Sequence, residues 1–249
     1  KGITLGSMES HLESYAEFAD VWKFGWGTAY VEKLLPSKIG LLRQHGITAC
    51  LGGTLLEIAW SQGQASECLD WAEQAGFTAI EVSRGVADMS MEAKWELIRT
   101  SAQSFRVFAE TGYKSAERPL TPTQWHAEIM GDLAAGAEYI VAEGRESGTV
   151  GLYDSHGMPQ TEVIDAALLA AGLDRVLFEA PRKNQQAWFI NTHGPEVNMG
   201  NVVPEDLLPL QPLRLGVHAD TTLVASGFTL ASGGHRCRFP GPSRVMSSS

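Results

Sequence analysis

The sequence has little cysteine and no long apolar run. Its three cysteines, Cys50, Cys68 and Cys237, are widely spaced and form no CxxC pair, which argues against a disulfide framework and against a zinc site. No apolar run approaches the roughly 18 residues of a membrane-spanning helix, and the first residues lack the layout of a signal peptide. We therefore expect a cytoplasmic protein in a reducing setting, with no membrane partner.

Basic residues are also scarce. Lys and Arg together number 19 against 29 Asp and Glu, so the formal net charge is −10. This balance argues against a nucleic-acid partner, which would require clustered basic side chains. Neither GxGxxG nor GxxxxGK[ST] occurs, and no Ser-His-Asp or Cys-His arrangement stands out. An anionic substrate would therefore have to meet a local group of cations inside a pocket.

The sequence does contain a regular alternation of short apolar runs and longer amphipathic stretches, which is typical of βα units around a parallel sheet. We expect eight strands, over 2–6, 20–25, 47–53, 78–83, 105–110, 137–143, 175–180 and 197–203. We expect helices over 8–18, 28–44, 55–75, 90–103, 121–135, 160–171, 184–193 and 204–213. With a length of 249 residues, the pattern predicts a single α/β domain, a TIM-type (β/α)₈ barrel over 1–221. The Gly-, Ser- and Arg-rich segment 222–249 is expected to be a poorly ordered C-terminal tail.

A charged residue or a glycine recurs where successive expected strands end. The first four of these positions are 29 residues apart, and the last two follow 33 and 36 residues later. The positions are Lys23, Gly52, Glu81, Glu110, Glu143 and Glu179. A single glutamate at such a position could simply cap the next helix or face water. Five charged strand ends at regular spacing instead favour a shared site at the carboxyl end of the barrel.

The loops that follow these strands add candidate residues. Lys114 lies four residues after Glu110 and could act as a proton donor, although a surface lysine is the default reading. Arg145 stands between Glu143 and Glu146 in a glycine-rich loop, where it could grip an oxyanion or form a salt-bridged loop.

Further loop positions could contact an anion. Arg182 and Lys183 open a helix, where cations oppose the helix dipole and so call for a compensating anion. Gly52 and Gly53 precede another helix whose first N–H groups attract anions, a weak signal because glycine turns are common. Asn201 could add a neutral hydrogen bond or could simply form a turn.

Eight segments share an order and a spacing that point to one family. They are KFGWGT (23–28), GGTLLE (52–57), EVS (81–83), AETGYK (109–114), EGRESG (143–148), FEAPRKNQQ (178–186), VNMGNV (197–202) and LRLGVHADT (213–221). Together they resemble the phosphosulfolactate synthase family from about Gly2 to Thr221. The fifth and sixth segments are the most specific, whereas each glycine turn alone would be a weak match.

The resemblance implies a Mg²⁺-dependent addition of sulfite to phosphoenolpyruvate that gives (2R)-phospho-3-sulfolactate, an early step towards coenzyme M or sulfolactate. Attack on C3 would generate an aci-carboxylate, which a metal could stabilise and an acid could protonate at C2. The expected partners are therefore two small anions. The chain would belong with the carbon–sulfur lyases.

With that activity implied, each candidate residue takes an expected role. Glu110, Glu143 and Glu179 are expected to hold Mg²⁺, because a hard cation prefers oxygen ligands. The expected catalytic residues are Lys114 as the acid, Arg145 and Glu146. The expected substrate-binding residues are Lys23, Gly52, Gly53, Glu81, Arg182, Lys183 and Asn201.

Two other readings stay open at this point. One is a barrel lyase that uses a different enolpyruvate or aldol-type reaction with another nucleophile. The other is a stress-associated relative that kept the barrel and lost turnover. Exposed apolar helix faces could also support a homo-oligomer.

Overall fold

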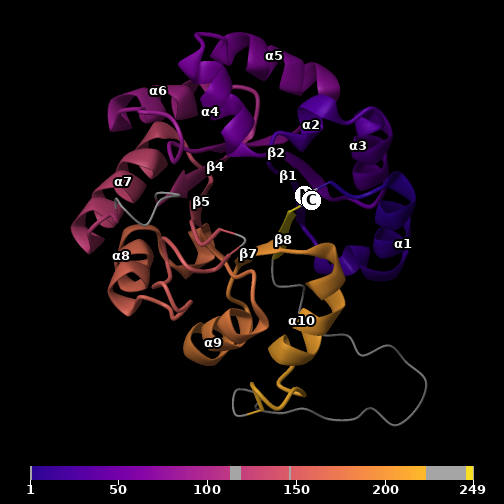
Figure 1. Ribbon diagram of the computed structural model, residues 1–249, viewed down its shortest axis with the longest axis vertical. Helices are drawn as coiled ribbons and strands as arrows, with labels where there is room; N and C mark the ends of the chain where they lie inside the picture. Colours follow the sequence, from indigo (N-terminus) through magenta and orange to yellow (C-terminus); the bar gives the residue numbers. More distant parts are fainter. Residues whose placement is uncertain (1, 113–118, 146, 223–244, 249) are drawn as a thin grey trace.

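The computed structural model describes residues 2–112, 119–145, 147–222 and 245–248. In these residues eight parallel strands pair in chain order into a closed barrel (Figure 1), which confirms the predicted fold class. The strands are β1 (Val21–Phe24), β2 (Thr48–Leu51), β3 (Ala79–Val82), β4 (Arg106–Thr111), β5 (Tyr139–Ala142), β6 (Val176–Glu179), β7 (Met199–Val202) and β8 (Val245–Ser248).

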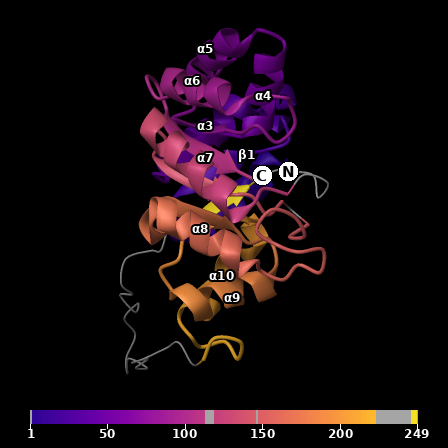
Figure 2. The same ribbon diagram turned by 90° about the vertical axis from the view of Figure 1, so that its left-hand side faces the viewer.

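Helices cover the outside of the barrel, with α1 to α7 around one half and α8 to α10 around the other (Figures 1 and 2). The α-helices are α1 (Leu5–Tyr15), α2 (Thr28–Val31), α3 (Leu35–Gln44), α4 (Gly53–Ser61), α5 (Ala65–Ala75), α6 (Met91–Ser101), α7 (Pro122–Ala135), α8 (Thr161–Ala171), α9 (Lys183–His193) and α10 (Leu207–Arg214). Short 3₁₀ turns lie at η1 (Ala16–Phe18), η2 (Leu173–Arg175) and η3 (Pro204–Asp206). Within the described ranges, no helix has both the length and the apolar character to cross a membrane.

Two of the expected long helices are each divided in the structure. The stretch 28–44 forms α2 and α3, and Pro36 lies in the first turn of the second. The stretch 55–75 forms α4 and α5, with Gly63 in the left-handed region at φ 72° between them. Proline suits a helix start and glycine a left-handed turn, so these residues favour a break where the apolar pattern alone suggested continuity.

The expected strand over 2–6 is wrong. Thr4 caps α1 by accepting a hydrogen bond from Ser7 N at 3.2 Å, and Met8 and Leu12, four residues apart, are buried on the same helix. The helical period therefore overrides the short apolar run. The eighth strand comes instead from β8, which pairs parallel with β1 and β7. The barrel thus does not end at Thr221, and its last strand lies inside the segment 222–249.

The barrel interior contains an apolar layer distinct from the core between strands and helices. Side chains alternate between the two faces of each strand, so every second residue faces inwards. In β3, for example, Ile80 and Val82 belong to the outer core, whereas Ala79 belongs to the inner layer. The inner layer consists of Val21, Cys50, Ala79, Phe108, Tyr139, Val141 and Leu177.

Candidate active site

The predicted strand-end residues, five charged side chains and Gly52, form the next layer above this apolar floor. Each lies two residues after a member of the inner layer, so the two-residue period turns it into the barrel as well. The pairs are Val21 and Lys23, Cys50 and Gly52, Ala79 and Glu81, Phe108 and Glu110, Val141 and Glu143, and Leu177 and Glu179. The six second members all line one pocket of about 520 Å³. The structure therefore brings the predicted strand-end residues together in this one pocket at the carboxyl end of the barrel, which we call the mouth.

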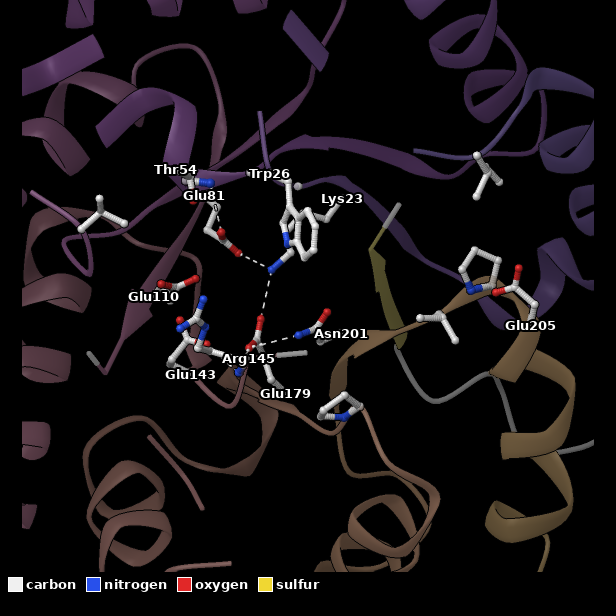
Figure 3. A pocket seen from close by; sticks show the side chains of 18 residues that line it. Lys23, Trp26, Thr54, Glu81, Glu110, Glu143, Arg145, Glu179, Asn201 and Glu205 are labelled. Carbon is white, nitrogen blue, oxygen red and sulfur yellow. Dashed lines mark hydrogen bonds and ion pairs between the residues drawn. The ribbon is translucent and has the colours of Figure 1, made fainter. Parts of the chain in front are cut away.

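Lys23 lies at the centre of this mouth, between two carboxylates (Figure 3). Its Nζ donates to Glu81 Oε2 at 2.9 Å and to Glu179 Oε1 at 3.1 Å. Burial by itself would lower the pKa of Lys23, but the attraction of Glu81, Glu179 and Glu110 outweighs it and holds the pKa well above its usual value. Lys23 is therefore a fixed positive charge.

Glu179 connects the end of β6 to three other parts of the mouth. Besides Lys23, its carboxylate accepts from Gly144 N at 3.0 Å, Arg145 N at 2.9 Å and Asn201 Nδ2 at 3.4 Å. Burial would raise the pKa of Glu179, but Lys23 and the N–H donors lower it. Four donors match the roughly four lone-pair sites of a carboxylate. Glu179 is therefore an ionised carboxylate that links the ends of β1 and β7 and the loop after β5 by hydrogen bonds.

The loop after β5 brings a second carboxylate to the same N–H group. Arg145 N donates to Glu143 Oε1 at 2.6 Å as well as to Glu179. Arg145 adopts φ 53°, in the left-handed region that a side chain other than glycine rarely occupies. Such a conformation persists only where its surroundings fix it. The backbone at Arg145 is thus shaped to hold two buried glutamates close together.

The glycine pair after β2 is required by close packing. A Cβ on Gly52 would lie 2.9 Å from Phe24 O, and one on Gly53 would lie 2.6 Å from Ser83 Oγ. Gly53 is the first residue of α4, and its backbone N–H donates to Glu81 Oε1 at 3.0 Å. The start of this helix is therefore already occupied by a carboxylate of the chain itself.

The remaining predicted residues are distributed differently. Asn201 lines the pocket and, like Arg145, has a left-handed backbone, at φ 56°. Arg182 and Lys183 are exposed and are not among the described residues that line the pocket. Lys183 pairs with Asp220 at 2.8 Å, and its side chain is 60% exposed. Lys114 and Glu146 lie outside the described residues.

The acidic residues of the pocket fit a metal ion only in part. Within the described part of the chain, no group of three or more Asp, Glu, His or Cys side chains is arranged to hold a metal ion. Glu110, on β4, and Glu143, directly after β5, both line the pocket. Glu143 Oε1 accepts a hydrogen bond from Arg145 N, whereas the oxygens of Glu179 accept four. Mg²⁺ commonly takes one or two carboxylates and completes its shell with water and substrate oxygens. Two of the three predicted ligands therefore suit Mg²⁺ in kind.

Two further residues line the pocket, and a third holds a loop beside it, without having been predicted as site residues. Trp26 and Glu205 line the mouth, and Glu205 lies on the opposite side from Glu110 (Figure 3). Buried Glu57 accepts from Ser83 Oγ at 2.7 Å and from Ala87 N, and so holds the loop after β3. In the sequence, Glu57 follows the apolar residues of GGTLLE, and a glutamate on an apolar helix face could have indicated a buried carboxylate.

A second buried ionic cluster lies behind β4, between α6 and α7. Lys94 Nζ donates to Glu128 Oε1 at 2.8 Å, Asp132 Oδ2 at 2.7 Å and the backbone oxygen of Glu110 at 2.7 Å. Arg84 binds Glu128 through two nitrogens, at 2.9 and 2.6 Å. The side chains of this cluster are absent from the described lining of the mouth. They are those of Arg84, Lys94, Glu128 and Asp132. The cluster therefore supports the strand that carries Glu110 from outside the barrel.

A closed (β/α)₈ barrel with a charged ring at the carboxyl ends of its strands has the architecture of barrel enzymes, whose active sites lie at that end. The family model described as (2R)-phospho-3-sulfolactate synthase (ComA) matches residues 1–220. The chain is 37% identical over 227 residues to the phosphosulfolactate synthase of Methanocaldococcus jannaschii, covering 89% of this chain and 90% of that one. It is 35% identical over 223 residues to that of Bacillus subtilis, covering 88% of each. The chain belongs to the (2R)-phospho-3-sulfolactate synthase family, which confirms the resemblance of its motifs.

Solved structures add information on the fold alone. A monomeric dihydrodipicolinate synthase variant matches with a TM-score of 0.54 at 12% identity, over 86% of this chain and 68% of that one. At this identity the match supports the barrel and says nothing about the substrate.

Proposed function

We propose that this chain catalyses the Mg²⁺-dependent addition of sulfite to C3 of phosphoenolpyruvate, giving (2R)-phospho-3-sulfolactate. Membership of the family and the name of its relatives support this reaction. The structural observation that carries it is the buried ion triad of Lys23, Glu81 and Glu179 at the base of the pocket. Its lysine supplies a fixed positive charge, which can stabilise the negative charge that develops when two anions react.

In this reaction the sulfur lone pair of sulfite forms the new bond to C3. The electron pair of the C2–C3 double bond moves towards C2 and its carboxylate, and C2 then takes up a proton. Lys23 would stabilise the developing negative charge by its position. Because the pKa of Lys23 is raised by its glutamate partners, it is a poor proton donor. Lys114 therefore remains the proposed acid.

The charge balance of the pocket supports the need for a cation. Among its described lining residues, five glutamates accompany only Lys23 and Arg145 as cations, so the lining would repel two anionic substrates by itself. Glu110 and Glu143 would hold Mg²⁺, with Glu179 behind them. When bound, the ion would supply a Lewis acid that offsets charge on the substrate oxygens. Arg145 would grip an oxyanion of the substrate.

Incubation of the purified chain with phosphoenolpyruvate, sulfite and Mg²⁺, followed by ³¹P NMR, tests the proposal. We expect a new organophosphate signal that requires both sulfite and the metal. A matched incubation with chelator in place of Mg²⁺ should give none. If no product forms with Mg²⁺ or Mn²⁺, the synthase proposal fails, and a non-catalytic relative or a lyase with another nucleophile becomes the better reading.

A further inference from the structure

The loop between β5 and α8 returns tightly onto its own beginning. Leu152 N donates to Glu143 O at 2.9 Å, and Leu152 is fully buried. A Cβ on Gly151 would lie 2.0 Å from Glu143 O, so the chain can pass at this point only as glycine. The loop that carries Arg145 is therefore packed against the mouth.

Gln185, in the first turn of α9, holds two separate parts of this loop. Its side chain is buried, and Nε2 donates to Gly148 O at 2.9 Å and to Gly157 O at 3.1 Å. A Cβ on Gly148 would lie 2.6 Å from both the oxygen and the nitrogen of this amide. The amide therefore fits between the two loop segments because glycine stands at the point of contact. We name this arrangement of Gln185, Gly148 and Gly157 the amide clamp.

The amide clamp is connected to the carboxylates of the mouth through one turn. Gly148 N donates to Arg145 O at 3.3 Å, and Arg145 N donates to Glu143 and Glu179 at 2.6 and 2.9 Å. Arg145 keeps its left-handed backbone only while these contacts hold it. A shift of the clamp would thus move the N–H that joins the two glutamates.

We propose that Gln185 is a positioning residue of this site, which acts by fixing the turn that aims Arg145 at Glu143 and Glu179. The amide is suited to this role because its NH₂ group donates twice to backbone oxygens. A glutamate of nearly the same shape has no donor to offer when ionised. The proposal rests on the proposed function only for its kinetic readout.

The variants Gln185→Glu and Gln185→Met test the clamp, and Asn184→Asp is the matched control. Asn184 is the exposed neighbour in the same helical turn, so Asn184→Asp adds the same charge without touching the loop. Gln185→Met removes the donors without introducing a charge, and so guards against a variant that fails to fold. Two measurements are compared: hydrogen exchange of peptides over 143–157, and kcat with KM for phosphoenolpyruvate.

We expect both Gln185 variants to exchange faster over 143–157 while β3 and β4 keep wild-type rates. KM for phosphoenolpyruvate should rise and kcat should fall, with kcat/KM reduced about 10- to 100-fold, since small misplacements of binding groups have effects of this size. A purely structural role would instead speed exchange throughout the barrel and lower the active fraction without changing KM.

Unchanged exchange over 143–157, or an unchanged KM in both variants, would overturn the positioning role. Asn184→Asp should match wild type in both measurements, and a rise in its KM would assign the effect to charge and contradict the clamp. If the wild-type chain forms no product at all, the proposed function fails. The exchange comparison then decides by itself whether Gln185 holds the loop.

Discussion

Two lysines of this barrel are buried in nearly the same chemical setting but in different places. Lys23 and Lys94 each donate to two carboxylates at 2.7 to 3.1 Å, and burial alone would lower the pKa of each. In both, the carboxylates reverse that effect and raise the pKa. Lys23 faces a pocket of about 520 Å³, whereas Lys94 is enclosed between α6, α7 and β4. The same kind of ion triad thus lines the candidate site in one place and lies in the enclosed packing between helices and strand in the other.

The comparison shows that access, rather than the set of side chains, separates a candidate site from a structural cluster. Water or substrate can reach Lys23 and replace a lost partner. The side chains around Lys94 have no such replacement, because Lys94 and Asp132 are completely buried. Substitutions in the two clusters should therefore separate their effects on activity from their effects on stability.

The largest effect is expected for Lys94→Met. It leaves Glu128 and Asp132 buried without their shared cation, and breaking a buried ion pair in this way typically costs about 3–5 kcal/mol. Denaturant unfolding should show this loss in the free energy of unfolding. Lys33→Met, at an exposed position, should change it by less than about 0.5 kcal/mol. Equal losses in the two variants would contradict the supporting role of Lys94.

Lys23→Met should instead affect activity more than stability. Turnover of the proposed reaction should fall about 100-fold or more, because a preorganised charge at the reacting centre is lost. Its free energy of unfolding should fall less than that of Lys94→Met, since the pocket admits water to Glu81 and Glu179. Synthase assays and denaturant curves on the same preparations measure both. A loss of stability as large as for Lys94→Met would remove the distinction between the clusters.

Asp132, in the cluster around Lys94, should make the free energy of unfolding depend on pH. Burial raises the pKa of Asp132 from 3.8 to about 6, although Lys94 opposes the rise. The folded chain therefore binds this proton more tightly than the unfolded chain, so the stability it contributes is present at low pH and is lost between about pH 4 and pH 6. The free energy of unfolding of wild type minus that of Asp132→Asn should fall by on the order of 2–3 kcal/mol over that range.

The mouth should respond to pH in the opposite sense. Although burial opposes it, Lys23 and the N–H donors lower the pKa of Glu179, so the stability from its ionised form is present above its usual pKa and is lost on acidification. Denaturant unfolding of wild type, Asp132→Asn and Glu179→Gln, from pH 7 down to below the usual pKa of glutamate, separates the two contributions. If the wild-type and Asp132→Asn curves run parallel, Asp132 does not titrate between pH 4 and 6.

The smallest effect is expected for Lys183→Ala. The pair of Lys183 and Asp220 is largely exposed, and such surface pairs contribute roughly 0–1 kcal/mol. Because Lys183 lies outside the described lining of the pocket, kcat/KM should stay within about twofold of wild type. Parallel steady-state kinetics and thermal unfolding check this. A large loss of activity with an unchanged thermal midpoint would return Lys183 to the substrate site.

The sequence by itself determined the barrel and most of its mouth. The alternation of strands and helices, and the two-residue period that turns Lys23, Glu81 and Glu179 inwards, are local properties of the chain. Because all strands of a parallel barrel end on one side, these local positions are enough to predict that the side chains converge. The structure confirms the fold, and it brings the strand-end residues to one pocket.

Only the tertiary structure decided how the ends of the chain and the loops are used. The apolar run at 2–6 could not be distinguished from a helix start until Met8 and Leu12 were seen packed in the core. A helical lysine such as Lys94 is by default exposed, and its burial depends on partners 34 and 38 residues away. Gln185 likewise contacts glycines 37 and 28 residues before it. Such contacts depend on how distant segments pack, which no local pattern records.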